Sequence, residues 1–156
     1  MAAQPIPEGY PVVAPYLCVD DAAAAIEYYT KAFGAKETVR MDGPEGLIAH
    51  AELEIGDSRI MLSDQFPQFA TKSPKELGGT TVSVFMYVED VDAVVKRAVE
   101  AGATVNMEPA DQFWGDRFGS VDDPFGHNWA IATHVEDVPP EEMQKRAAAA
   151  MAQMGG

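Results

Sequence analysis

The chain has 156 residues, 47% of them hydrophobic, which suits one ordinary domain or two small halves that share a buried core. Its 25 acidic and 11 basic residues give a formal net charge of −14, which argues against a nucleic-acid-binding surface and against binding to anionic lipid. The single cysteine, Cys18, excludes an internal disulfide, and the sequence predicts neither a signal peptide nor a membrane span. We therefore expect a cytoplasmic protein without nucleic-acid or membrane partners.

The first half of the chain predicts a loose segment over residues 1–10, then one strand, one helix and three more strands. Asp20 or Asp21 is expected to cap the helix, and Gly34 to end it. The strands are expected over residues 11–19, 36–41, 46–56 and 58–64. In the third of these, polar side chains alternate with Ala and Leu, which predicts one polar and one buried face. Residues 65–79 show no period and are expected to form a loop.

The same order of elements then begins again. Strands are expected over residues 80–88, 104–113, 115–122 and 127–135, and a helix is expected between Asp90 and Gly102. The segments VDDAAAAIEYYTKAFGA and VEDVDAVVKRAVEAGA share the same pattern of valine, acidic residue, aspartate, helix and Gly-Ala, which indicates a duplicated unit. The alternative is a coincidence between two ordinary strand–helix units. We predict an α+β fold of two βαβββ modules, 11–64 and 80–135, which form a shared cup. A tail with a terminal helix follows over 136–156.

Two segments carry a family resemblance, IAHAELEIGDSRIMLSD and FWGDRFGSVDDPFGHNWAIATHVED. Together with the duplicated βαβββ unit, they resemble the PhnB-like branch of the vicinal oxygen chelate superfamily, which includes glyoxalase I, bleomycin-resistance proteins and extradiol dioxygenases. The DDPFG stretch (122–126) is itself explained as a tight turn, without chemistry. The resemblance implies a metal site in the cup, with ligands on the first and last strands of each module, commonly two His and two Glu.

At the four positions that match these ligands, the sequence has other residues: Ala14, Met61, Ser83 and Ala130. Alanine and methionine offer a hard divalent cation almost nothing, and one serine cannot hold it alone. We therefore predict a cup without a metal or another cofactor. Bleomycin-resistance proteins of the same superfamily lack the metal and act by binding a drug, so the resemblance favours a non-catalytic, antibiotic-resistance-like binding role.

The expected ligand is a small, partly apolar or aromatic molecule, and the resemblance implies a homodimer. The candidate wall residues of the cup are Tyr16, His50, Met61, Ser83, Phe85, Trp114 and Phe118. Core packing is the alternative for Trp114 and Phe118. Trp129 is expected on the core side, and His127 is expected to face away from the cup and to bond a backbone group.

The rival function is an enzyme of the superfamily, a glyoxalase-like lyase or isomerase. It would use His50, with Glu52, as acid–base groups, or recruit a metal through ligands other than the four positions. The structural alternative for His50 is a histidine satisfied by a neighbouring carboxylate. In a third alternative, side chains fill the cup and the protein acts through its surface.

Overall fold

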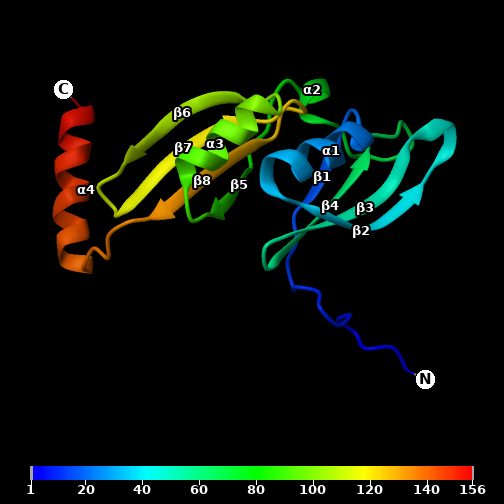
Figure 1. Ribbon diagram of the computed structural model, residues 1–156, viewed down its shortest axis with the longest axis horizontal. Coiled ribbons are helices and arrows are strands. Elements are labelled where there is room, and N and C mark those ends of the chain that lie inside the picture. The colour runs from blue at the N-terminus through cyan, green and yellow to red at the C-terminus, as the bar shows by residue number, and fades with distance from the viewer. Residues whose placement is uncertain (1, 156) are drawn as a thin grey trace.

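Two four-stranded sheets, each backed by a helix, form the body of the chain in this computed structural model, which describes residues 2–155 (Figure 1). The first sheet has the strand order β1-β4-β3-β2, with β1 parallel to β4 and the other pairs antiparallel. The elements of this first module are β1 (Tyr16–Val19), α1 (Ala22–Phe33), β2 (Lys36–Asp42), the 3-10 turn η1 (Pro44–Gly46), β3 (Ile48–Ile55) and β4 (Ser58–Asp64).

The second sheet repeats this arrangement with the order β5-β8-β7-β6 and a parallel β5–β8 pair. Its elements are β5 (Ser83–Tyr87), α3 (Val91–Glu100), β6 (Thr104–Asp111), β7 (Asp116–Asp122) and β8 (Asn128–His134). The same element order and the same pairing in both halves confirm the predicted α+β fold of two βαβββ modules.

The two main helices begin at equivalent aspartates. Asp21 Oδ1 accepts a hydrogen bond of 3.0 Å from the Ala24 amide, and Asp90 Oδ1 accepts one of 3.0 Å from Ala93. Each side chain satisfies an amide that has no partner within the helix. At the end of α1, Gly34 has φ 67°, a left-handed conformation that glycine adopts without a steric penalty.

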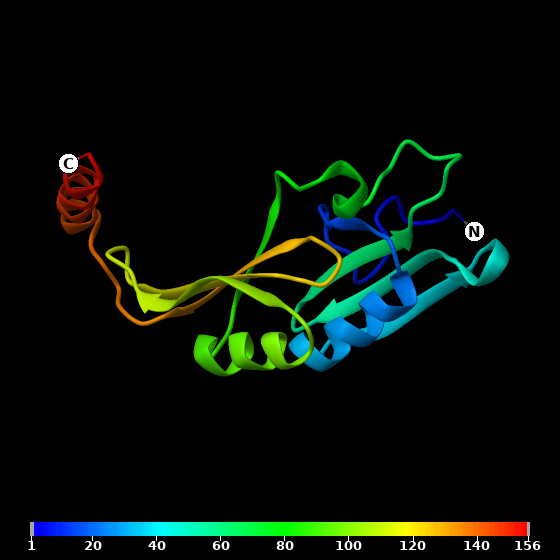
Figure 2. The same ribbon diagram turned by 90° about the horizontal axis from the view of Figure 1, so that it is seen from above.

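The hydrophobic core lies between the helices and the sheets. Both helices lie on the same side of the two sheets, and α1 packs directly against α3 (Figure 2). Ala51 and Leu53 of β3 point into this core, as their alternation with His50 and Glu52 predicts. Trp129 of β8 is 1% exposed, so the predicted core position of this residue is confirmed. We call the side of each sheet that faces away from the helices its open face.

Buried hydrogen bonds join the two modules. The Asp123 carboxylate accepts a bond of 2.5 Å from the Tyr29 hydroxyl in α1 and one of 2.9 Å from Trp129 Nε1 in β8. The same carboxylate accepts bonds from the amides of Phe125 and His127. His127 Nε2 in turn donates to the Cys18 carbonyl of β1 at 2.9 Å. The DDPFG turn therefore does more than reverse the chain, because its aspartate links α1 to the second sheet.

Three elements depart from the expected pattern. β1 is shorter than predicted, since Pro11 and Pro15 lack the amide hydrogen that a ladder needs. The segment 65–79 contains a short helix, α2 (Pro74–Leu77), which Ser73 caps by accepting a bond from the Glu76 amide. The terminal helix α4 (Pro140–Met154) buries none of its residues and stands at the far end of the second sheet (Figure 1). Within residues 2–155, no helix is long and apolar enough to cross a bilayer.

Candidate functional site

The open face of the first sheet carries a Tyr–His–Glu triad formed by Tyr16, His50 and Glu52. The Tyr16 hydroxyl lies 2.8 Å from His50 Nδ1, and His50 Nε2 lies 3.0 Å from Glu52 Oε1. An ionised carboxylate only accepts hydrogen bonds, so in the neutral imidazole Glu52 fixes the proton on Nε2 and leaves Nδ1 to accept the proton of Tyr16. The triad therefore provides a hydrogen-bonded path from an exposed phenol to a buried carboxylate.

Glu52 is held in place by more than His50. It is 6% exposed, and it accepts a bond of 2.7 Å from the Tyr10 hydroxyl and one of 2.8 Å from Arg59 Nη1. Burial raises the pKa of Glu52, but the hydrogen bonds from His50, Tyr10 and Arg59 outweigh it, so the pKa lies below the ordinary value. The Arg59 guanidinium also lies 4.2 Å from the centre of the Tyr10 ring. The N-terminal segment thus reaches the open face of the first sheet.

The open face of the second sheet carries a cluster of aromatic rings, which we call the aromatic platform: Phe85, Tyr87, Trp114 and Phe118. The ring centres of Phe85 and Tyr87 are 4.9 Å apart, those of Phe85 and Phe118 are 6.2 Å apart, and those of Trp114 and Phe118 are 6.0 Å apart. Phe85 is 49% exposed and Tyr87 is 63% exposed, although large apolar rings usually lie in the core.

A buried carboxylate anchors the edge of this platform. Asp116 is 3% exposed and accepts bonds from the Tyr87 hydroxyl at 2.9 Å and from Trp114 Nε1 at 3.1 Å. Its other oxygen lies 2.8 Å from Nδ1 of His134. Burial raises the pKa of Asp116, but the bonds from His134, Tyr87 and Trp114 lower it further than burial raises it. The hydrogen bonds to Asp116 and Asp137 raise the pKa of His134 above its ordinary value.

The seven candidate wall residues fall into two groups, one on each sheet. Tyr16, His50 and Met61 share the first open face, where Met61 pairs with Tyr16 in the β1–β4 ladder. Phe85, Trp114 and Phe118 meet on the second open face. Ser83 instead donates to Asn128 Oδ1 at 2.6 Å, outside the platform. Among the side-chain hydrogen bonds and aromatic contacts of residues 2–155, none joins one group to the other.

Tyr87 of the platform, and Tyr10 and Arg59, which bond the triad, were not among the sequence candidates. Tyr87 has the same strand parity as Phe85, so alternation alone could have identified it. Tyr10 is 42 residues from its partner Glu52, and no local pattern predicts such a contact.

The residues present do not fit the metal that the family fold implies. The four expected ligand positions hold Ala14, Met61, Ser83 and Ala130. Within residues 2–155, no group of three or more His, Cys, Asp or Glu side chains is arranged to hold a metal ion. Neither the thioether of Met61 nor a single serine hydroxyl provides the oxygen and nitrogen ligands that a hard divalent cation needs.

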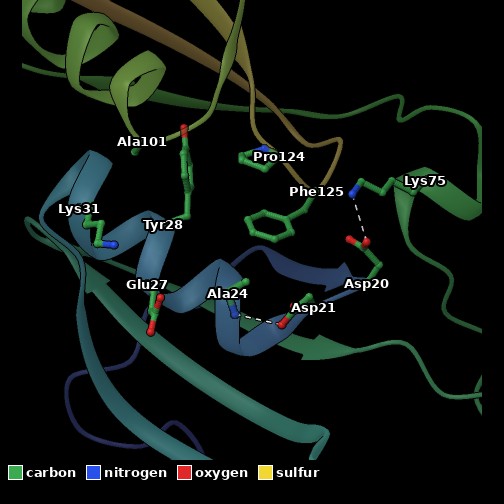
Figure 3. Close-up of a pocket in the computed structure, with 10 residues that line it drawn as sticks. All are labelled: Asp20, Asp21, Ala24, Glu27, Tyr28, Lys31, Lys75, Ala101, Pro124 and Phe125. Carbon is green, nitrogen blue, oxygen red and sulfur yellow. Dashed lines mark hydrogen bonds and ion pairs between the residues drawn. The ribbon is translucent and has the colours of Figure 1, made fainter.

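Hollows open at two places on the surface that residues 2–155 form. The smaller, about 350 Å³, lies near the start of α1, where Lys75 pairs with Asp20 at 3.1 Å and Tyr28 and Phe125 form the apolar wall (Figure 3). The larger, about 790 Å³, lies between the β3–β4 turn, α3 and the edge strand β5, and both Phe85 and Tyr87 line it. Its volume is in the range of small-molecule sites, but Phe33, Val94 and Trp129 also line it, so it lies on the helix side of β5 rather than over the aromatic platform.

Comparison with known proteins agrees with the fold. An uncharacterised protein of Mycobacterium tuberculosis (strain H37Rv) is 47% identical over 148 residues, which cover 93% of this chain and 85% of that protein. The crystal structure of TioX from Micromonospora sp. ML1 is similar with a TM-score of 0.63 and 28% identity, covering 79% of this chain and 98% of that one. The PhnB protein from Bacillus cereus shares the fold, with a TM-score of 0.62 and 18% identity, covering 79% and 99% of the two chains. The family model that matches residues 11–131 is that of the Glyoxalase/Bleomycin resistance protein/Dioxygenase superfamily, and the chain belongs to this superfamily.

Proposed function

We propose that this protein is a metal-free small-molecule binding protein, similar in role to bleomycin-resistance proteins, which binds or sequesters a partly apolar or aromatic ligand. The observation that supports this most strongly is the aromatic platform. Its rings expose large apolar surfaces on an open sheet face, and a planar ligand that stacks on them would remove those surfaces from water.

We further propose that the cup is completed in a homodimer. One chain holds the triad and the platform on two open faces that lie on the same side of the molecule, away from both helices (Figure 2). A second copy placed face to face would set the triad of one subunit opposite the platform of the other and cover the exposed Tyr16 and Phe85. Light scattering during size-exclusion chromatography tests this, and a monomer at all concentrations would contradict it.

Binding is tested by a thermal-shift screen of planar aromatic compounds, antibiotics among them, followed by calorimetric titration of the hits. Phe118→Ala removes one ring of the platform and is expected to weaken binding about tenfold or more. The matched control is Phe69→Ala, an exposed ring in the 65–79 loop, which should leave the affinity unchanged. If no compound binds, or if both variants bind equally well, the platform is not the site.

The absence of a metal requirement is tested in the same titration. Protein treated with a strong chelator should bind the ligand as tightly as protein purified without one, because the four expected ligand positions do not provide a metal site. A bound metal at one ion per chain whose removal abolishes binding would overturn this part of the proposal.

The Tyr–His–Glu triad favours a second candidate, a lyase or isomerase in which His50 acts as the acid–base group. Glu52 orients His50, and Tyr16 presents its hydroxyl to the solvent-exposed face, so a ligand proton could pass to His50 Nδ1 through the phenol. Glyoxalase and isomerase assays test this candidate. Turnover that falls at least a hundredfold in both His50→Gln and Tyr16→Phe would establish it, and equal rates in all three proteins would exclude it.

A resistance role and a cytoplasmic location are proposed with the binding function. Expression in a sensitive bacterial host should raise the inhibitory concentration of a bound antibiotic, and Phe118→Ala should remove the protection. Protection that persists in this variant would point away from sequestration on the platform.

A further inference from the structure

We propose that the aromatic platform selects planar organic cations over neutral or anionic molecules of the same shape. The inference rests on the proposed binding function and adds the chemical class of the ligand. It follows from the faces of the rings, from the carboxylate that bonds two of them, and from the charges at the outer end of the second sheet.

The rings provide the first part of the argument. The face of an aromatic ring carries the negative side of its quadrupole and attracts a cation that lies over it within about 6 Å. Phe85 and Tyr87 present such faces with 49% and 63% exposure. The Phe85 and Phe118 rings are stacked with their planes 29° apart, so together they form a surface on which a flat ligand can lie.

Asp116 strengthens this preference through the rings that it contacts. Tyr87 donates its hydroxyl proton, and Trp114 its indole proton, to the same carboxylate oxygen. Hydrogen bonding to an anion shifts electron density into the donating ring system, which makes the ring face more attractive to a cation. Because Asp116 is 3% exposed, a ligand meets its charge mainly through these two rings rather than by direct contact.

The charges at the outer end of the second sheet act in the same direction. Beside Asp116, the carboxylates there are Glu136, Asp137 and Glu142. The cationic groups that bond these carboxylates are Arg146, which Glu136 binds through both of its oxygens, and His134, which lies between Asp116 and Asp137. Within this hydrogen-bonded cluster near Trp114, four carboxylates therefore face two basic groups.

Arg117 is a basic side chain that would attract an anion, but other carboxylates already bind it. Arg117, next to Asp116 in β7, bonds Asp92 and Asp111 rather than Asp116. Its pKa lies above the ordinary value because of those two carboxylates, and its charge is already compensated. With a formal net charge of −14 over the whole chain, the long-range field also favours cations.

The test compares three flat tricyclic probes by calorimetric titration: proflavine as a cation, acridone as a neutral molecule and anthraquinone-2-sulfonate as an anion. At low ionic strength, proflavine should bind about tenfold more tightly than acridone, and the sulfonate most weakly. In about 1 M salt, where the screening length falls to about 3 Å, the advantage of the cation should shrink.

Matched variants locate the effect. Phe118→Ala should weaken all three probes, whereas Phe69→Ala should change none of them. Asp137→Asn removes a fully exposed charge beside His134, so it should weaken proflavine alone, by a few-fold, with only a small effect on folding. Asp42→Asn, at the exposed end of β2 in the other module, is the charge control and should leave proflavine binding unchanged.

The outcomes separate this inference from the function on which it rests. Binding of acridone that equals or exceeds that of proflavine, with loss in Phe118→Ala, would overturn the cation preference and leave the binding function standing. Proflavine binding that Phe118→Ala does not alter would show attraction to the acidic surface in general and would overturn the platform as the cation site. If none of the probes, and none of the screened compounds, binds at the platform, both proposals fail.

Discussion

Replacing Asp123 by alanine should destabilise the protein strongly. The Asp123 carboxylate satisfies two buried side-chain donors, the Tyr29 hydroxyl and Trp129 Nε1, whose residues are 0% and 1% exposed. Each buried donor left without a partner costs about 1–3 kcal/mol. We therefore expect Asp123→Ala to lower the free energy of unfolding by about 4 kcal/mol, a large part of the stability of a domain of this size.

Urea unfolding followed by circular dichroism measures this loss, and two further variants test the reasoning. Tyr29→Phe removes one donor and leaves the carboxylate bonded to three others, so it should cost only about 1–2 kcal/mol. When Asp123→Ala and Tyr29→Phe are combined, the loss of unfolding free energy should be smaller than the sum of the two single losses. The donor that Asp123→Ala leaves without a partner is already absent in Tyr29→Phe. Asp122→Ala, one residue away and bonded only to the partly exposed Asn128 side chain, should cost under about 1 kcal/mol. A loss in Asp123→Ala no larger than that of Asp122→Ala would refute the argument.

Three further predictions concern pH and the terminal helix. The folded-state pKa of Glu52 is lowered, so its contribution to stability is present above the ordinary pKa near 4.5 and is lost as the pH falls through the lower folded value. Between neutral pH and that folded value, the melting temperature of Glu52→Gln should therefore fall less than that of the wild type. The folded-state pKa of His134 is raised, so its contribution to stability is present below the ordinary pKa near 6.5 and is lost as the pH rises through the higher folded value. Over that pH range, the melting temperature of the wild type should change more than that of His134→Gln. An equal or smaller change in the wild type would contradict the prediction. Truncation after Asp137 removes α4, which buries no residue and bonds the body through exposed Arg146 pairs, so the unfolding free energy should change by less than about 1 kcal/mol.

Strand alternation predicted which side of each strand faces the core, because parity depends only on neighbouring residues. It placed His50 and Glu52 together on one face and Trp129 on the other, and the structure confirms both arrangements. The repeat of strand, capped helix and glycine likewise predicted the two modules, since each signal lies within a few residues of the next.

These local patterns could not predict contacts between residues that are far apart in the chain. The Asp123 carboxylate is 94 residues from Tyr29, and Asp116 is 29 residues from Tyr87. Whether two such groups meet depends on how one sheet sits against the other and on the path of the connecting loops. The short helix α2 was missed for a different reason. Its capping signal, Ser73 followed three residues later by Glu76, was present but stood in a segment without hydrophobic periodicity.

The placement of the core on the helix side of both sheets has a practical meaning for engineering and for evolution. Residues that hold the chain together, such as Tyr29 and Trp129, are separated by the thickness of a sheet from those that meet solvent on the opposite surface. Under the proposed binding function, exchanging Phe85 or Phe118 is therefore expected to alter which ligands bind while barely disturbing the fold. One scaffold of this kind can acquire many different ligands through a handful of surface changes.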